Sequence, residues 1–189
     1  LILGTTSSPD FPVTATAYDT SFAGGVDYIG AIPNYIGGSD IIVAKLNGSG
    51  TVLTGSTYIG GTGNDGLNLS DTLNYNYADE FRGELIIDDN DNIYVASSTL
   101  SVDFPNTGGV FQPLLGGLQD GCVFKLSADV TNLIWSSFIG GSNDDAAYSL
   151  VLNDLGEVLI TGGTTSSDFL TTPSALIPNY QLGESDGWI

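Results

Sequence analysis

The sequence of 189 residues carries a formal net charge of −19, lacks histidine and has only three basic residues, Lys45, Arg82 and Lys125. Phosphate backbones are bound by clustered lysine and arginine, so this charge balance argues against nucleic acid as a partner and disfavours anionic membrane surfaces. Hydrophobic residues make up 41% of the chain, which is enough for a core. No apolar run approaches the ~18 residues that span a bilayer, so we expect no membrane insertion.

The composition favours short strands and tight turns. The chain has 26 glycines together with many Ser, Thr and Asn residues and β-branched runs, a profile typical of all-β proteins. No segment shows sustained helical spacing of apolar residues. Cys122 is the single cysteine and lies in an apolar run, which indicates a small buried hydrophobe.

Four sequence signatures recur along the chain in a fixed order. They are Asp-Phe-Pro or Asp-Phe-Leu corners at 10–12, 103–105 and 168–170; apolar runs opened by aspartate at 40–46, 120–126 and 186–189; hydroxyl-aromatic-Ile-Gly-Gly runs at 56–61 and 136–141; and paired apolar runs at 83–95 and 148–160. Such self-similarity is typical of repeat architectures.

The spacing of these signatures gives a repeat of about 65 residues, because Asp168 follows Asp103 by 65 positions. The approximate units are 1–102, 103–167 and 168–189. The first unit is longer, with inserts near 23–34 and 68–76 that are rich in Gly, Asn and Tyr. Inserts in repeats map to loops and are often the interacting parts, so we expect exposed interaction loops there.

One unit contains four strand signals separated by turn-like segments: Cys122–Leu126, Leu133–Ile139, Ser149–Asn153 and Val158–Gly162. Four antiparallel strands per repeat are the blade of a β-propeller. Leu1 aligns with Tyr94 and Ile189 with Val123, so both ends of the sequence fall inside predicted strands. The sequence therefore predicts an all-β partial propeller of four-stranded antiparallel meanders, one domain over 1–189, to be completed by further blades of the same parent chain.

The ordered run ITGGTTSSDF, DGCVFKL, SSFIGG and SLVLNDLGEVLITG resembles the seven-bladed β-propeller type (SBBP) repeat of large bacterial surface and secreted proteins, many of them from Bacteroidota. The resemblance covers the chain apart from the two inserts and Leu170, where the other corners have proline. It implies a propeller scaffold in an exported multidomain protein, some of which are similar to adhesins or to components of gliding motility and type 9 secretion. It brings no catalytic motif.

The acidic run at 88–92 is the best metal candidate. Asp88, Asn90 and Asn92 place oxygen ligands at alternating positions, as calcium loops do. The glycine and distal glutamate of an EF-hand are missing, and the equivalent stretch 153–157 is a plain hairpin turn. Calcium and a structural turn both stay open here, and the acidic pairs 79–80 and 144–145 pose the same choice.

Tyrosines in and beside the inserts are the candidate interaction residues, namely Tyr28, Tyr35, Tyr75 and Tyr77. They are suited to stacking on sugars or to a protein contact, and equally to capping a blade edge. The run Ile-Pro-Asn-Tyr at 32–35 recurs at 177–180, which favours a structural role for Tyr35. The equivalent Lys45 and Lys125 are expected to pair with carboxylates of neighbouring strands.

Catalysis has little support, because a chain without histidine cannot form a Ser–His–Asp or Cys–His site. The leading hypothesis is a non-catalytic adhesion or protein-interaction module, extracellular or on the cell surface and associated with the outer membrane. One alternative is a carbohydrate-binding or carbohydrate-active propeller. Another is a cargo or accessory chain of a secretion or motility assembly. The expected partner is a protein or a glycan, with no cofactor except the calcium considered above.

Overall fold

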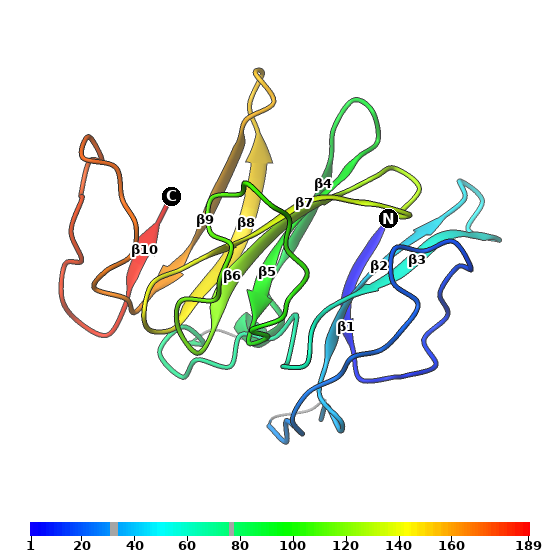
Figure 1. The fold of residues 1–189 in the computed structure, drawn as a ribbon, viewed down its shortest axis with the longest axis horizontal. Coiled ribbons are helices and arrows are strands. Elements are labelled where there is room, and N and C mark those ends of the chain that lie inside the picture. Colours follow the sequence, from blue (N-terminus) through cyan, green and yellow to red (C-terminus); the bar gives the residue numbers. More distant parts are fainter. Residues whose placement is uncertain (31–33, 76–77) are drawn as a thin grey trace.

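The computed structural model describes residues 1–30, 34–75 and 78–189, which form strands joined by turns and loops (Figure 1). Helical structure in these residues is a single 3₁₀ turn, η1 (Asp79–Phe81). The described residues accordingly contain no helix with the length and apolar character needed to cross a bilayer. The strands are β1 (Ile2–Thr6), β2 (Asp40–Leu46), β3 (Leu53–Ile59), β4 (Glu84–Ile87), β5 (Ile93–Thr99), β6 (Asp120–Leu126), β7 (Leu133–Ile139), β8 (Asp145–Leu152), β9 (Val158–Thr164) and β10 (Asp186–Trp188).

The strands form three antiparallel sheets, each of which takes its strands in chain order. The first sheet is β1-β2-β3, the middle sheet is the four-stranded meander β4-β5-β6-β7, and the third sheet is β8-β9-β10. The all-β prediction is confirmed, and β7 has the predicted bounds. The observed β8 begins four residues before the predicted strand because Asp145 already pairs with Thr164 of β9.

The sheets divide the chain at points other than the repeat units 1–102, 103–167 and 168–189. The break between the middle and third sheets lies between Ile139 and Asp145, inside the second unit. The middle sheet therefore takes β4 and β5 from one unit and β6 and β7 from the next. The sequence period fixes the number of strands in a repeat, whereas hydrogen bonding decides where one sheet ends.

The four tight hairpins share one turn geometry. In each, the fourth residue has a positive φ: Gly50, Asp91, Val130 and Gly156. Glycine and aspartate adopt this conformation readily, whereas a β-branched residue rarely does. Val130 is fully buried in the core beside Gly55, where an added Cβ would lie 2.7 Å from Cγ2 of Val130. The side chain of Val130 is thus buried although its backbone conformation is strained. Its position also explains why residue 55 is a glycine, because a side chain there would collide with it.

The three sheets stack face to face, and the middle sheet is covered on both sides. Alternation along β5 shows this arrangement, because Ile93 and Val95 belong to the core shared with the first sheet, and Tyr94 and Ala96 to the core shared with the third. The first core is made by Ile41, Val43, Ile59, Ile93, Val95, Phe104, Cys122, Phe124, Leu126, Val130 and Phe138. The second has four buried members, Tyr94, Ala96, Ala147 and Leu150, with partly buried neighbours.

The Asp-Phe-Pro corner at 103–105 packs its phenylalanine into the first core. Phe104 is 1% exposed, and its ring centroid lies 6.2 Å from that of Phe124 and 6.1 Å from that of Phe138. The carboxylate of Asp103 accepts hydrogen bonds from the backbone N–H and hydroxyl of Thr62. Thr62 belongs to the connection between the first and middle sheets, so this corner fastens one sheet to the next.

The outer edges of β3 and β7 are covered by equivalent loops. Thr14 donates its N–H to the carbonyl of Ser56 in β3, at 3.0 Å. In the middle sheet, Thr107 donates to Ser136 and Phe138 donates to Gln112, at 3.3 and 3.0 Å. These loops satisfy backbone groups that would otherwise form open sheet edges.

Replacing Phe104 with alanine should lower the free energy of unfolding by about 3–5 kcal/mol, because it leaves a cavity among the rings of the first core. Phe111→Ala is the matched control, since Phe111 is 64% exposed, and it should cost less than about 1 kcal/mol. Urea denaturation followed by circular dichroism measures both. Equal losses in the two variants would contradict the packing described for the corner.

Candidate functional site

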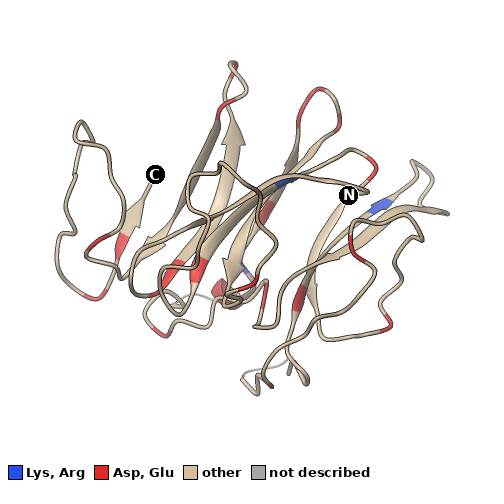
Figure 2. Cartoon of the chain, in the orientation of Figure 1, with Lys and Arg blue, Asp and Glu red and all other residues tan. Residues whose placement is uncertain are grey.

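Four aspartates lie fully buried in two pairs, each beside the Gly-Gly segment at the start of a connection between sheets. Asp40, Asp120 and Asp145 are the first residues of β2, β6 and β8, and Asp65 precedes β4. All four have 0% exposure. Figure 2 shows acidic positions along the lower ends of these strands, away from the hairpin turns at the top of the view. The burial of these four residues was not predicted from the sequence.

The pair in the first repeat is held by backbone and hydroxyl donors. Asp40 accepts hydrogen bonds from the N–H groups of Ala23 and Gly24, at 2.8 and 3.0 Å. Asp65 accepts from the N–H of Gly61 at 2.7 Å and from the hydroxyls of Thr99 and Ser101. Each carboxylate therefore anchors a loop that leaves or enters a strand.

The second repeat has the same arrangement. Asp120 accepts hydrogen bonds from the N–H groups of Gly116 and Gly117 and from the amide of Gln112. Asp145 accepts from the N–H of Gly141 at 2.7 Å and from the hydroxyl of Ser166 at 2.8 Å. Because the two repeats hold their carboxylates with similar hydrogen bonds, these aspartates belong to the repeated structure.

A glycine lies against both carboxyl groups of each pair. A Cβ added at Gly60 would meet Oδ1 of Asp40 at 2.7 Å and Oδ2 of Asp65 at 2.9 Å. A Cβ at Gly140 would meet Oδ1 of Asp120 at 2.6 Å and the nearer oxygen of Asp145 at 2.9 Å. This close approach explains why the Gly-Gly signature recurs at 60–61 and 140–141.

Burial without a positive partner raises the pKa of these acids. Desolvation raises the pKa of Asp40 and Asp120 to about 6 and that of Asp65 to about 7, against the opposing effect of the N–H donors. The pKa of Asp145 is also raised by burial. In the described part of the chain the ion pairs are Arg82–Asp79 and Lys125–Asp88, and neither involves these four groups.

These shifts fix the sign of the pH dependence of stability. An acid with a higher pKa in the folded state binds its proton more tightly when the protein is folded. Its contribution to the free energy of unfolding is therefore fully present below the unfolded pKa of about 4, and it is lost as the pH rises through about 6–7. Asp103 and Asp168 act oppositely, because hydrogen bonds from Thr62 and Ser142 lower their pKa. Their contribution is lost as the pH falls below about 4.

The free energy of unfolding should therefore be greatest in mild acid and should fall by about 2 kcal/mol or more between pH 5 and pH 8 (roughly 1.4 kcal/mol for each unit of pKa shift). Asp65→Asn should reduce this fall, because it removes the group with the highest pKa of the three. Asp10→Asn changes the net charge equally at an exposed position and should leave the slope unchanged. Urea denaturation across this pH range measures it; a slope identical in both variants would contradict the assignment.

Asp88, Asn90 and Asn92 form the turn between β4 and β5. Oδ1 of Asp88 accepts the N–H groups of Asn90 and Asn92, each at 2.9 Å, and Oδ2 accepts the amide of Asn92 at 3.0 Å. The ammonium of Lys125 lies 3.1 Å from the same carboxylate. Although burial alone would raise it, the bonds from Asn92 and Lys125 hold the pKa of Asp88 below its usual range.

The protein thus satisfies both oxygens of Asp88 with its own donors. Within residues 1–30, 34–75 and 78–189, no group of three His, Cys, Asp or Glu residues is placed to hold a metal. The geometry favours the structural-turn interpretation, and calcium binding stays a prediction. Lys125 pairs with a carboxylate as predicted, whereas Lys45 donates instead to the backbone carbonyl of Ala128 at 3.1 Å.

A turn held by internal donors predicts a melting temperature that neither EDTA nor added CaCl₂ changes. Asp88→Ala should nevertheless lower the free energy of unfolding by about 1–3 kcal/mol, because it leaves two turn N–H groups without their acceptor and Lys125 without its carboxylate partner. Differential scanning calorimetry measures both effects. A calcium-dependent rise in melting temperature that is absent in Asp88→Asn would instead establish the calcium site.

The tyrosines do not share one environment. Tyr35 is buried at 8% exposure, which corrects its expected place in an exposed loop, and its ring lies 6.0 Å from that of Phe81. Tyr28 is partly buried and pairs with Tyr35 through two backbone hydrogen bonds of 2.9 Å. Tyr75 is exposed, and its hydroxyl donates to Glu184. Tyr77 lies outside the described residues.

The second insert, near 68–76, is part of the longer connection between β3 and β4. We call the described parts of this connection, 62–75 and 78–82, the strap (Figure 1, lower edge). Within the insert, Asn68, Ser70 and Leu73 are at most 5% exposed, whereas Asp71 and Tyr75 are exposed, so the expected exposed loop is corrected in part. The strap accepts a hydrogen bond from Gln119 at Oδ1 of Asn68 and one from Tyr148 at the carbonyl of Leu73.

A mixed cavity of about 400 Å³ lies where the strap and Tyr35, the residue after the first insert, meet β1 and β4. Its lining combines the aromatic rings of Tyr35 and Phe81 with the polar groups of Thr5, Glu84 and Ser97. Glu84 also reaches the third sheet, where it accepts hydrogen bonds from the hydroxyl of Ser149 and the N–H of Leu150. Neither this cavity nor the one described next is lined by any of the four buried aspartates.

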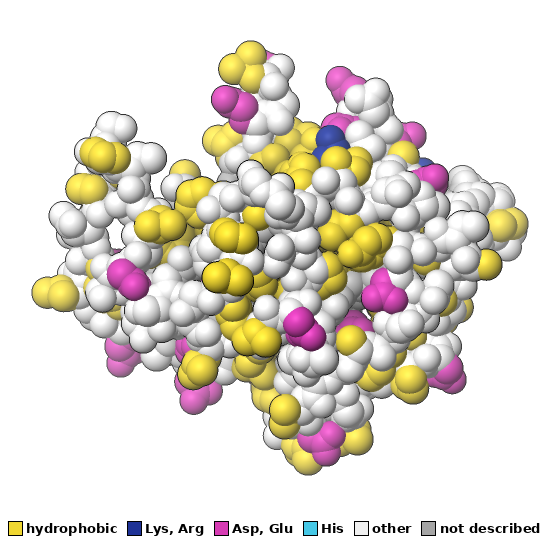
Figure 3. Space-filling view, in the orientation of Figure 1, with side chains coloured by type: hydrophobic (Ala, Val, Ile, Leu, Met, Phe, Trp, Pro, Cys, Tyr) yellow, Lys and Arg dark blue, Asp and Glu magenta, His cyan; other side chains and the backbone are white. Residues whose placement is uncertain are grey.

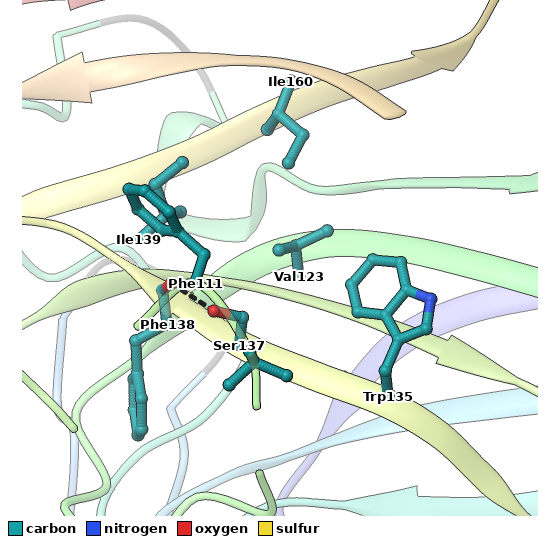
Figure 4. A pocket seen from close by; sticks show the side chains of 8 residues that line it. Phe111, Val123, Trp135, Ser137, Phe138, Ile139 and Ile160 are labelled. Carbon is teal, nitrogen blue, oxygen red and sulfur yellow. Dashed lines mark hydrogen bonds between the residues drawn. The ribbon is translucent and has the colours of Figure 1, made fainter. Parts of the chain in front are cut away.

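An apolar groove of about 310 Å³ lies between the middle and third sheets. Figure 4 shows Val123, Trp135 and Ile139 of the middle sheet facing Ile160 of β9, with Phe111 of the preceding loop at the side. Apart from Ser137, whose hydroxyl is bonded to backbone carbonyls of Gln112 and Phe138, the side chains that line it are hydrophobic. It can accommodate apolar side chains and offers no reactive group.

No protein-family model matches the chain, and no curated protein matches it. The resemblance to the SBBP repeat stays a prediction that depends on the recurring signatures themselves.

Proposed function

We propose that the three sheets are successive blades of a β-propeller and that the chain is a non-catalytic interaction module of a surface-exposed or secreted bacterial protein. Two features support the propeller. The sheets are antiparallel meanders stacked face to face, and the last strand of one sheet leads to the first strand of the next, as in propeller blades. The extracellular location is supported by the resemblance of the repeat and by the strongly acidic composition.

The observation that carries the interaction role is the exposed apolar surface of two loops. In the loop 100–119, Val102, Leu114 and Leu118 are 74%, 71% and 80% exposed. In the loop 165–185, Leu176 and Leu182 are 98% and 84% exposed. Figure 3 shows hydrophobic side chains gathered on the viewed face in this region. Contiguous exposed apolar residues on a folded protein mark interaction sites, so we assign the partner contact to these loops.

The double variant Leu114→Asp with Leu118→Asp should weaken partner binding at least tenfold, because it charges the centre of the apolar loop. Binding is measured by biolayer interferometry against a panel of purified bacterial envelope and extracellular-matrix proteins. The control is Val52→Asp with Leu155→Asp, which adds the same charge at two exposed hairpin turns. Absence of any binding, or equal weakening by the control, would overturn the assignment.

A second candidate is carbohydrate binding at the mixed cavity, favoured by its combination of aromatic rings and polar groups. Sugars bind by stacking on rings and by hydrogen bonding to such polar side chains. On a glycan array, Phe81→Ala should abolish binding, because Phe81 lines the cavity, while Phe111→Ala, which lies in the apolar groove, should not. Loss in both variants, or binding in neither protein nor variants, would remove this candidate.

A further inference from the structure

The hairpin between β2 and β3 turns at Asn47-Gly48, the one position in the sequence at which a glycine follows an asparagine. Residues 48–52 are exposed and Asn47 is partly exposed, so water reaches this turn. Within the part of the chain that the structure describes, the backbone N–H of Gly48 donates to no acceptor. Its nitrogen is therefore not engaged in the hydrogen bonding of the hairpin.

The turn holds the side-chain amide of Asn47 through donors to its oxygen. Oδ1 accepts the N–H groups of Thr51 and Val52, at 2.8 and 3.2 Å, and Nδ2 donates to Oγ1 of Thr51 at 3.1 Å. Two N–H groups on a carbonyl oxygen stabilise the negative charge that develops there when a nucleophile adds to the carbon. The amide carbon Cγ of Asn47 is thus a polarised electrophile.

The backbone nitrogen of Gly48 is the nucleophile closest along the chain to this carbon. Its attack on Cγ closes a succinimide ring, and an intramolecular reaction needs no second molecule to be brought into place. A Cβ on the residue after the asparagine hinders this approach, and glycine has none. A Cβ added at Gly48 would meet no atom within 4 Å, and its φ lies outside the left-handed region, so the fold itself does not require glycine here.

Asn153 in the β8–β9 hairpin provides a comparison within the same chain. Its Oδ1 likewise accepts two N–H groups, from Leu155 at 3.0 Å and from Glu157 at 2.9 Å. The next residue is Asp154, whose Cβ hinders the nitrogen that would attack. The two turns therefore present similarly polarised amides and differ in the nucleophile.

We propose that Asn47 is a self-modification site, at which the backbone nitrogen of Gly48 displaces ammonia from the side-chain amide. The bond between this nitrogen and Cγ forms, the bond between Cγ and Nδ2 breaks, and the proton of the Gly48 N–H leaves with the ammonia. Water then hydrolyses the succinimide. Cleavage of the new bond to Cγ leaves aspartate at position 47, and cleavage of the original peptide bond leaves isoaspartate.

The two products affect the hairpin differently. A carboxylate at position 47 can accept the turn N–H groups, as Asp88 does in the next hairpin, so the aspartate product keeps the turn closed. Isoaspartate adds a methylene group to the main chain and displaces the turn from the register of β2 and β3. The inference goes beyond the interaction role proposed above and does not depend on the propeller or on any partner.

The test is peptide mapping by tandem mass spectrometry of the folded protein during incubation in mildly alkaline buffer. Asn47 should gain one mass unit, divided between aspartate and isoaspartate, at a rate at least tenfold above that of Asn153. Gly48→Ala should slow the conversion at least tenfold. Its melting temperature should equal that of the wild type, because the added methyl group meets no neighbouring atom, and this separates the chemistry from unfolding.

A synthetic peptide of residues 44–55 gives the reference rate without the folded turn, and the folded protein should match or exceed it. A folded protein that reacts at least tenfold more slowly than the peptide would overturn the proposal, because the turn would then hold the amide away from Gly48. Conversion at Asn47 no faster than at Asn153, or equal rates in Gly48→Ala and the wild type, would overturn it as well.

Discussion

Buried carboxylates at the crossings between sheets are the constraint on which the architecture depends. A carboxylate removed from water needs hydrogen-bond donors in fixed positions. Asp65 and Asp145 obtain them from the N–H of a Gly-Gly segment and from the hydroxyls of Ser101 and Ser166, which follow β5 and β9. The connection therefore must fold back over the strand ends, which sets the last strand of one sheet close to the first strand of the next.

This constraint accounts for the composition of the repeat. Glycine at 60 and 140 is required because a side chain would collide with a carboxyl pair. The Ser- and Thr-rich segments before the corners supply hydroxyl donors to the buried carboxylates. Asp103 and Asp168 accept hydrogen bonds from Thr62 and Ser142, and so they also hold the connections between sheets. Some of the acidic side chains of the chain are thus buried, and the buried carboxyl groups bind protons more readily than those at the surface.

The two sheet interfaces are chemically similar but unequally filled. The first is packed by the rings of Phe104, Phe124 and Phe138. At the second, Phe169 stacks on Trp188 at 5.1 Å, and the groove beside Trp135 and Ile160 stays open.

Much of the fold follows from the sequence because the strand signals are local. The strand 133–139 and the hairpin turns depend on neighbouring residues and alternation. The grouping of strands into sheets, the burial of Tyr35 and the path of the strap depend on contacts between distant segments, such as Gln119 with Asn68. The sequence did contain a pattern that could have predicted the buried aspartates. Asp40 and Asp120 are the first residues of equivalent apolar strands, and a residue of a surface turn has no reason to recur at the same position.

The most direct test of this account is a ¹³C NMR titration of the aspartate side-chain carboxyl groups in the folded protein. The account predicts that Asp65 titrates near pH 7, that Asp40 and Asp120 titrate near pH 6, and that Asp103 and Asp168 titrate below the usual range. If all of these aspartates titrated together near pH 4, the carboxyl groups would be solvated, and the crossings between sheets would have to be held in another way.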